Sequence, residues 1–178
     1  MKIISGSLKG RIIEGYDIIG TRPTMQRVKE SLFATIQNHI NNSLVLDLFA
    51  GTGNYGIEAI SNGSKFVYFN DSNSICTKVI KNNLDKFKVN NYQILNLDYM
   101  KCLKYLNNIK LDLIFLDPPY REDYINKALS YIDEYDMLND NGLVICELIN
   151  NNLSNNYQHF SIWKEKKYGD KRVIIYKK

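Results

Sequence analysis

Short apolar segments alternate with longer amphipathic ones along most of the chain. The apolar segments predict five buried strands, over residues 44–48, 65–70, 92–97, 111–116 and 143–147. Between them, apolar side chains recur every three or four positions, which predicts helices over residues 55–61, 73–88, 99–106 and 124–134. Strands that alternate with helices in this way are typical of an α/β fold around a mostly parallel sheet.

The C-terminal end of the chain carries a different pattern. Residues 157–163 and 172–176 alternate apolar and polar side chains on either side of the turn-forming pair Gly169-Asp170. This pattern predicts an antiparallel hairpin that closes one edge of the sheet. We therefore predict a seven-stranded, mostly parallel sheet with an antiparallel C-terminal hairpin.

A small β/helix extension is predicted at the N-terminal end. Residues 2–5 and 11–14 are strand-like and are separated by glycines. An amphipathic helix follows over about residues 22–38 and lies across the sheet, with an apolar stripe of Val28, Leu32, Phe33 and Ile36. Thr24 is the predicted N-cap of this helix, because Pro23 disfavours helical backbone in the residue before it.

The length of 178 residues suits a single domain, with an extension over residues 1–40 and a core over residues 41–178. The N-terminal sequence lacks the apolar stretch of a signal peptide, and no segment approaches the roughly twenty apolar residues of a membrane span. We therefore expect a cytoplasmic protein. The three cysteines, Cys76, Cys102 and Cys146, lack metal-ligand spacing, so we expect buried thiols and no metal site.

The net charge of +4 is modest, but the charges are unevenly distributed. Acidic residues gather over residues 112–140, while basic residues concentrate at both ends of the chain. The basic residues of the two ends are Lys2, Lys9, Arg11, Arg22, Arg27 and Lys29, and Lys164, Lys166, Lys167, Lys171, Arg172, Lys177 and Lys178. The two ends would form one surface for a phosphate backbone. An ordinary solvated face explains the same charges equally well.

A glycine-rich turn follows the first predicted buried strand. Its candidate ligand-binding residues are Asp47, Phe49, Ala50, Gly51, Thr52 and Gly53. Glycines let the backbone approach a ligand closely, and the start of the next helix presents free amide groups. Turns of this kind also bind dinucleotides. The carboxylate of Asp47 favours a ligand with a positive amino or sulfonium group over a diphosphate, so we interpret the turn as a methyl-donor site.

Two further carboxylates follow the next two predicted strands. In an open α/β sheet, the carboxyl ends of the strands form the ligand crevice. Asp71 is a candidate ligand for both hydroxyls of a ribose, and Asp98 is a candidate ligand for an adenine amine. The alternative for each carboxylate is to cap the helix that follows it.

The tetrapeptide Asp117-Pro118-Pro119-Tyr120 follows the predicted strand over residues 111–116. Two consecutive prolines stiffen the chain and remove amide donors, which leaves carbonyl groups as acceptors. The Asp117 carboxylate and the Pro118 carbonyl would accept hydrogen bonds from both N–H groups of an exocyclic amine and so hold its lone pair toward a methyl group. Tyr120 would offer a face on which the base stacks. These four residues are the predicted catalytic residues, and the alternative is an ordinary strand-to-loop turn.

Several of these segments resemble a known family. LDLFAGTGNYG followed by DPPY resembles class I methyltransferases that modify exocyclic amines. IISGSLKGR, TRPTMQRVKESLF and KKYGDKRVIIYKK narrow the resemblance to the RsmD-type 16S ribosomal RNA guanine-N2 methyltransferases, over essentially the whole chain. Some members have a Glu two residues before the second acidic residue, where this chain has Phe69, which leaves Asp71 as the candidate ribose ligand.

The resemblance implies a Rossmann-like class I methyltransferase fold that uses S-adenosyl-L-methionine to methylate the N2 amine of a guanine. The implied partner is ribosomal RNA or a small ribosomal subunit particle, and we expect a monomer that needs no metal. Arg11, Arg22 and Arg27 are candidate contacts for RNA phosphates. Thr24, like Arg22, is a candidate contact at the methionine end of the cofactor.

Three other functions suit parts of the same pattern. A DNA adenine-amine methyltransferase uses the same tetrapeptide but generally needs an added target-recognition region, for which the chain has no insertion. A protein-glutamine methyltransferase faces the same chemical problem at an amide nitrogen. A catalytically silent RNA-binding protein of the same fold would not need the strand-end acids together with an unbroken DPPY.

Overall fold

Seven strands form one sheet in the computed structural model, which describes residues 1–15, 23–119, 123–149 and 153–178. The strands are β1 (Leu44–Asp47), β2 (Phe66–Asn70), β3 (Tyr92–Leu95), β4 (Leu111–Leu116), β5 (Leu138–Ile149), β6 (Ser161–Tyr168) and β7 (Lys171–Lys177). The helices are α1 (Pro23–Ile36), the 3₁₀ helix η2 (Gln37–His39), α2 (Asn54–Ser61), α3 (Ser74–Lys86), α4 (Tyr99–Leu106) and α5 (Tyr124–Glu134).

The order of the strands in the sheet is β3-β2-β1-β4-β5-β7-β6. β1 pairs in parallel with both β2 and β4, and β7 pairs in an antiparallel manner with β5 and β6. The chain first extends the sheet from β1 to β3 and then returns to the other side of β1 to add β4 and β5. This topology confirms the predicted Rossmann-like α/β fold, with its mostly parallel sheet and antiparallel C-terminal hairpin.

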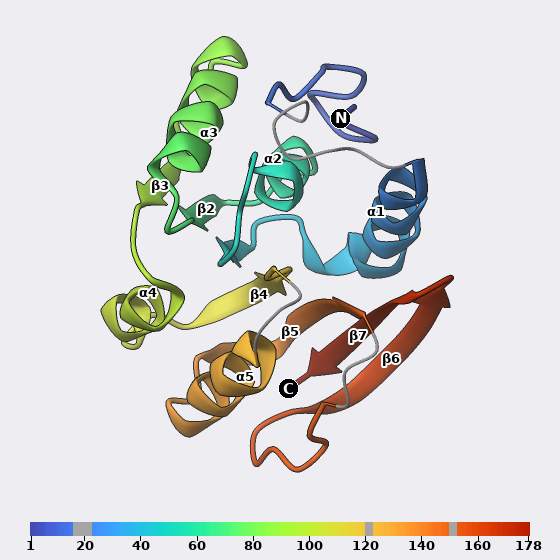
Figure 1. The fold of residues 1–178 in the computed structure, drawn as a ribbon, viewed down its shortest axis with the longest axis vertical. Helices are drawn as coiled ribbons and strands as arrows, with labels where there is room; N and C mark the ends of the chain where they lie inside the picture. Colours follow the sequence, from blue (N-terminus) through green and yellow to red (C-terminus); the bar gives the residue numbers. More distant parts are fainter. Residues whose placement is uncertain (16–22, 120–122, 150–152) are drawn as a thin grey trace.

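Helices cover both faces of the sheet (Figure 1). α1, α2 and α3 lie on one face, and α4 and α5 lie on the other. Because successive side chains of a strand point to opposite faces, each central strand contributes to two separate apolar cores. Val45, Phe115 and Ile145 belong to the core under α1 and α2, whereas neighbouring positions such as Leu46 and Ile114 belong to the core under α4 and α5.

Helix α1 has the predicted apolar stripe but not the predicted start. Val28, Leu32, Phe33 and Ile36 are all buried, which confirms the stripe. The helix begins at Pro23, so the prediction that Thr24 is the N-cap is wrong. Proline suits the first helical position, because its fixed φ is already helical and its missing amide has no partner there.

The predicted strand-like segments at the N-terminal end pair with each other, but less extensively than two strands would. Residues 2–5 and 11–14 meet in a single antiparallel bridge between Lys2 and Ile12. The amides of Ile4 and Ser5 do not extend a ladder, because they donate to the carboxylate of Glu58 at 3.0 and 2.9 Å. A side chain of α2 therefore binds these two amides, while Ile3 keeps its backbone hydrogen bonds to Gly10 and Arg11.

The strands near the C-terminal end differ from the prediction in their limits. β5 already begins at Leu138, and β6 runs from Ser161 to Tyr168 instead of over residues 157–163. Phe160 is buried and Tyr157 is partly buried, and both rings lie edge-on against Tyr176 in the core under α4 and α5. The apolar residues that suggested a strand there serve the packing of a loop.

Cys102 and Cys146 are buried as predicted, but Cys76 is only half-buried. Within the described ranges, no group of three or more His, Cys, Asp or Glu side chains is arranged to hold a metal ion. None of the helices in those ranges combines the length and the apolar character needed to cross a lipid bilayer.

A buried ion pair joins the N-terminal segment, α1 and α2. Lys29 Nζ lies 2.9 Å from Glu58 Oε2, and both side chains have no exposed surface. The same ammonium group donates to the Lys2 carbonyl at 3.0 Å and to Asn54 Oδ1 at 2.8 Å. Desolvation lowers the pKa of Lys29, and Glu58 opposes this shift. The expectation that Lys29 belongs to a basic surface is therefore wrong.

We predict that Lys29→Met lowers the free energy of unfolding by about 3–5 kcal/mol, because it leaves the Glu58 charge buried without its cation. Lys29→Met/Glu58→Gln should lose less than the single variant, since no buried charge remains and the amide oxygen still accepts from Ile4 and Ser5. Urea denaturation would measure both losses. Lys81→Met is the control, because the Lys81–Asp85 pair is more than half exposed and should contribute little to stability. Similar losses for Lys29→Met and Lys81→Met would contradict the prediction.

Candidate active site

Carboxylates gather where the parallel strands end. Asp47 is the last residue of β1, Asp117 directly follows β4, and Glu147 lies near the end of β5. The register pairs Leu116 with Cys146, so Asp117 and Glu147 are the next positions on two neighbouring strands. The three acids therefore share one edge of the sheet.

The same three carboxylates also share one face of the sheet. Val45, Phe115 and Ile145 precede them by two positions and pack under α1 and α2. Because side chains two positions apart point to the same side, Asp47, Asp117 and Glu147 face α1 and α2 as well. This place lies between β1 and β4, where the strand order reverses and where open α/β sheets bind their ligands.

The glycine turn is held by bonds to neighbouring strand ends. The Ala50 amide donates to the Asn70 carbonyl at 2.9 Å, and the Gly51 amide donates to Asp71 Oδ2 at 2.8 Å. Helix α2 then starts very close to β2, because a Cβ on Gly56 would lie 2.2 Å from the Phe69 ring. The Gly56 amide in turn donates to Asp47 Oδ2 at 2.9 Å.

Asp71 and Asp98 have different roles at their strand ends. Asp71 joins the glycine turn to the start of α3, since its other oxygen accepts from the Asn73 amide at 2.8 Å, while Asn73 itself is the N-cap. Asp98 is the N-cap of α4 and accepts from Met100 and Lys101. The capping alternative is therefore confirmed for Asp98. Its role toward adenine, like the role of Asp71 toward ribose, stays a prediction.

The surroundings of Asp47 disfavour its ionised form. Its side chain is 2% exposed, and burial raises its pKa to about 7. The hydrogen bond from Gly56 lowers the pKa, and the Asp71 carboxylate raises it. A cationic ligand nearby would stabilise the charged form, which agrees with the interpretation of the turn as a methyl-donor site.

Aromatic rings from three elements meet beside the glycine turn. Phe49 stacks on Tyr124 with 5.9 Å between the ring centroids and lies 5.4 Å from the Tyr99 ring. Phe49 is partly buried, and Ala50 and Thr52 are buried. These rings come from the turn after β1 and from the starts of α4 and α5, so they form an apolar wall near the strand ends.

Asp117 lies beside a network that the sequence interpretation missed. The buried Tyr55 hydroxyl donates to Glu147, and Lys171 of β7 forms an ion pair with the same carboxylate. Tyr55 is held by its ring, which stacks on Phe115 with 5.2 Å between centroids and 9° between planes.

Glu147 could have been found by the rule that identified Asp47, Asp71 and Asp98, since it ends the fifth predicted strand. Nothing local in the sequence indicates the pairing with Tyr55 or Lys171.

Desolvation raises the pKa of Asp117 well above its usual range. The neighbouring carboxylates of Glu147 and Asp47 raise it further, whereas the Lys171 ammonium lowers it. Of the adjoining prolines, Pro118 is buried and Pro119 is exposed. The protonation of Asp117 therefore depends on charges from three other strands.

Some predicted site residues are not brought together by the described structure. Tyr120 and Arg22 lie outside the described residues, as does the side chain of Thr24. Arg11 and Arg27 are both exposed, and the Arg11 guanidinium lies 5.7 Å from the centroid of the Phe87 ring. RNA contacts for these residues stay predictions.

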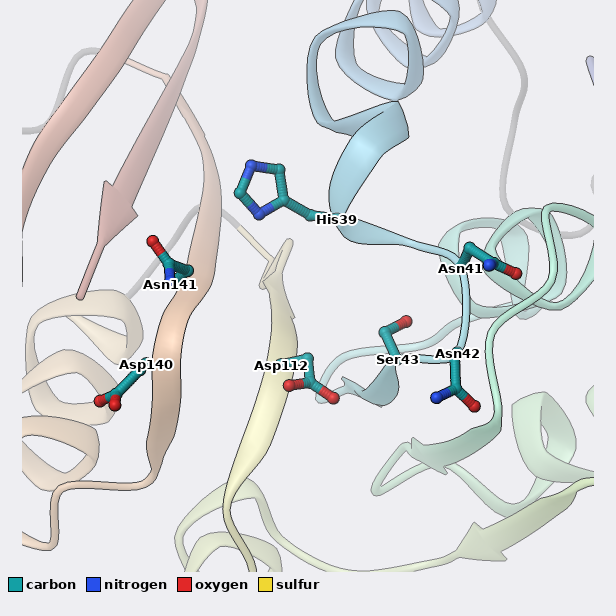
Figure 2. Close-up of a pocket in the computed structure, with 7 residues that line it drawn as sticks. All are labelled: His39, Asn41, Asn42, Ser43, Asp112, Asp140 and Asn141. Carbon is teal, nitrogen blue, oxygen red and sulfur yellow. The ribbon is translucent and has the colours of Figure 1, made fainter.

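A cavity of about 180 Å³ lies at the opposite edge of the sheet (Figure 2). It is lined by His39, Asn41, Asn42, Ser43, Asp112, Asp140 and Asn141, which surround the start of β1 and the early parts of β4 and β5. Asp112 is already engaged, because its oxygens accept from the Leu44 amide at 2.7 Å and from Asn139 at 2.9 Å. This cavity is separate from the edge that carries Asp47 and Asp117.

The parallel sheet, the glycine turn at its reversal point and the DPP sequence after β4 define a class I methyltransferase fold. Among solved structures, Escherichia coli YhhF has a TM-score of 0.88 and 26% identity, and the match covers 100% of this chain and 97% of that one. The family described as "Conserved hypothetical protein 95" matches residues 1–177. The chain belongs to this family, the RsmD family, which confirms the resemblance seen in the sequence.

Two curated relatives carry a more specific name. Ribosomal RNA small subunit methyltransferase D of Haemophilus influenzae is 33% identical over 174 residues, which cover 95% of this chain and 89% of the relative. The protein of the same name from Escherichia coli K12 is 27% identical over 179 residues, which cover 100% of this chain and 90% of the relative.

We predict that Asp47→Asn changes how stability depends on pH. The folded pKa of about 7 lies above the ordinary value of 3.8, so the folded state keeps a proton that the unfolded state releases. The wild type therefore loses stability as the pH rises from about 4 to about 7, by up to about 4 kcal/mol relative to a variant that does not titrate there. Urea denaturation of both proteins at pH 4.5 and pH 7.5 would measure this difference. An Asn variant that gains nothing over the wild type at the higher pH would contradict the prediction.

Proposed function

We propose that the protein transfers a methyl group from S-adenosyl-L-methionine to the exocyclic N2 amine of a guanine in 16S ribosomal RNA. The observation that carries the proposal is the position of Asp117 and Pro118 beside the glycine turn, where the strand order reverses. The relatives named ribosomal RNA small subunit methyltransferase D support ribosomal RNA as the substrate. The proposal includes a single-domain monomer that works in the cytoplasm on ribosomal RNA or on a small ribosomal subunit particle.

The residues around the glycine turn suit S-adenosyl-L-methionine. A Cβ on Gly51 would meet no atom within 4 Å, so the backbone of the turn is open to a ligand. Asp71 is held firmly by the turn, and its oxygens keep lone pairs for the ribose hydroxyls. Phe49 and Tyr99 offer an apolar surface for the purine, and the charge of Asp47 favours a cation. Bound there, the cofactor supplies an electrophilic methyl group on a sulfonium.

Asp117 and Pro118 would prepare the amine of the substrate. The lone pair of an exocyclic amine is delocalised into the ring, so the nitrogen is a poor nucleophile unless its two N–H groups are held in a way that directs the lone pair toward the methyl group. The Asp117 carboxylate and the Pro118 carbonyl would accept hydrogen bonds from these two N–H groups. Positioning of this kind contributes up to about 7–11 kcal/mol for well-oriented reactants. The guanine must be unpaired or flipped out to reach this edge of the sheet.

Methyl transfer with labelled donor would test the proposal. The purified protein is incubated with small ribosomal subunits that lack the modification, with naked 16S ribosomal RNA and with DNA, and the methylated nucleotide is then mapped. We expect label on the N2 atom of one guanine of the ribosomal RNA. Label confined to adenine in DNA would favour the DNA methyltransferase, and RNA binding without any transfer would favour the silent protein.

We predict that Asp117→Ala lowers turnover at least about a hundredfold, because an electrostatic contact made in the transition state is lost. Binding of S-adenosyl-L-methionine, measured by calorimetry, should stay within about twofold, since the proposed cofactor contacts lie on other strands. Asp85→Ala, at an exposed carboxylate of α3, is the control and should keep both properties. Equal losses of binding and turnover in Asp117→Ala would contradict the assigned role.

A further inference from the structure

Three strands and one helix bring charged and titratable groups to the neighbourhood of Asp117. Asp47 comes from β1, Glu147 from β5, Lys171 from β7 and Tyr55 from α2. Asp117 itself follows β4. Lys171 belongs to the C-terminal hairpin, whose strand β7 lies beside β5 in the sheet (Figure 1).

The register explains how the hairpin reaches this place. β7 pairs Val173 with Glu147 and Lys171 with Ile149. Val173 packs in the core under α1 and α2, so Lys171, two positions away, faces the same side as Glu147. The ion pair between Lys171 and Glu147 follows from this alternation.

We propose that Glu147 and Lys171 are positioning residues that set the ionisation of Asp117 in opposite directions: Lys171 favours the ionised form, which accepts a hydrogen bond from the amine of the substrate, and Glu147 opposes it. The inference rests on the proposed function, because it concerns the same amine. A protonated Asp117 would keep its carbonyl oxygen as an acceptor, but that neutral oxygen accepts a weaker hydrogen bond than a carboxylate, and the other oxygen would become a donor.

The charges around Asp117 act in opposite directions. Glu147 is a like charge and disfavours the ionised form of Asp117, whereas the Lys171 ammonium favours it. The Tyr55 hydroxyl fixes Glu147 by donating a hydrogen bond, and the pKa of Tyr55 is raised well above its ordinary value by burial and by Glu147. Tyr55 therefore stays protonated and remains a donor. The ionisation of Asp117 therefore depends on Lys171, which is paired with a Glu147 carboxylate that Tyr55 holds in place.

Two variants change this balance in opposite directions. Lys171→Met removes the cation, so the pKa of Asp117 rises and a higher pH is needed to ionise it. Glu147→Gln removes the like charge but keeps an oxygen that accepts from Tyr55, so the pKa of Asp117 falls. Activity that needs the ionised form should therefore begin at a higher pH in the first variant and at a lower pH in the second.

The pH dependence of kcat/KM tests the inference, because it reports groups of the free enzyme. Methyl transfer to small ribosomal subunits lacking the modification is measured from pH 5.5 to pH 9 for the wild type and both variants. We expect the acidic limb of the profile to move up by about one pH unit in Lys171→Met and down by about one unit in Glu147→Gln. Lys104→Met, which changes an exposed lysine of α4, is the control and should leave the limb in place.

A second measurement needs no substrate. The ¹³C shift of the Asp117 carboxyl carbon, assigned by its loss in Asp117→Asn, is followed through a pH titration of each purified protein. Opposite displacements of its midpoint in the two variants would support the inference, and unchanged or same-direction midpoints would overturn it. If Lys171→Met does not fold, Glu147→Gln alone still tests the inference, because the inference requires its midpoint to fall. A wild type that methylates none of the substrates would overturn the proposed function, and the carboxyl titration would still decide the inference about Asp117.

Discussion

The architecture of the site depends on one buried ion pair. Lys29 and Glu58 meet between α1 and α2, where neither charge has contact with solvent, and they bind the backbone of the N-terminal segment at the same time. Burial of two charges is unfavourable unless every remaining donor and acceptor is also satisfied. Here the amides of the N-terminal segment and the side chain of Asn54 satisfy them. Asn54 directly follows the glycine turn, so the pair that anchors the extension also holds the beginning of α2.

The same physical problem recurs at the strand ends. Asp47, Asp117 and Glu147 bring like charges to one poorly solvated place, which would be unfavourable without nearby compensation. The Gly56 amide, the Tyr55 hydroxyl and the Lys171 ammonium supply it from α2 and β7. Because Tyr55 and Lys171 lie 92 and 24 positions from Glu147 in the chain, the protonation of the site is tied to correct packing of both the helix and the hairpin. Perturbed acids of this kind are common at functional sites.

Local patterns predict most of the core, and their failures have a physical cause. The strands and helices over residues 44–134 follow from apolar spacing, and they agree with the structure to within a few residues at their ends. The pattern fails where a segment is buried for another reason. Tyr157 and Phe160 look like strand residues but pack as a loop against Tyr176, and the strand-like residues 2–5 have amides that bind a side chain. Apolar side chains indicate that a segment is buried, and these segments are held by contacts other than strand pairing in the sheet.

The sequence by itself determined the order of the elements, the glycine turn with Asp47, the DPP sequence after β4 and the family. Each of these is encoded by neighbouring residues, so their spacing alone reveals them. Only the tertiary structure decided that Lys29 is an internal cation, that Asp98 is a helix cap, and that Glu147 and Lys171 adjoin Asp117. These roles depend on contacts between residues far apart in the chain, such as Tyr55 and Glu147, which are separated by 92 positions. Sheet register and helix packing create such contacts, and no local period in the sequence encodes them.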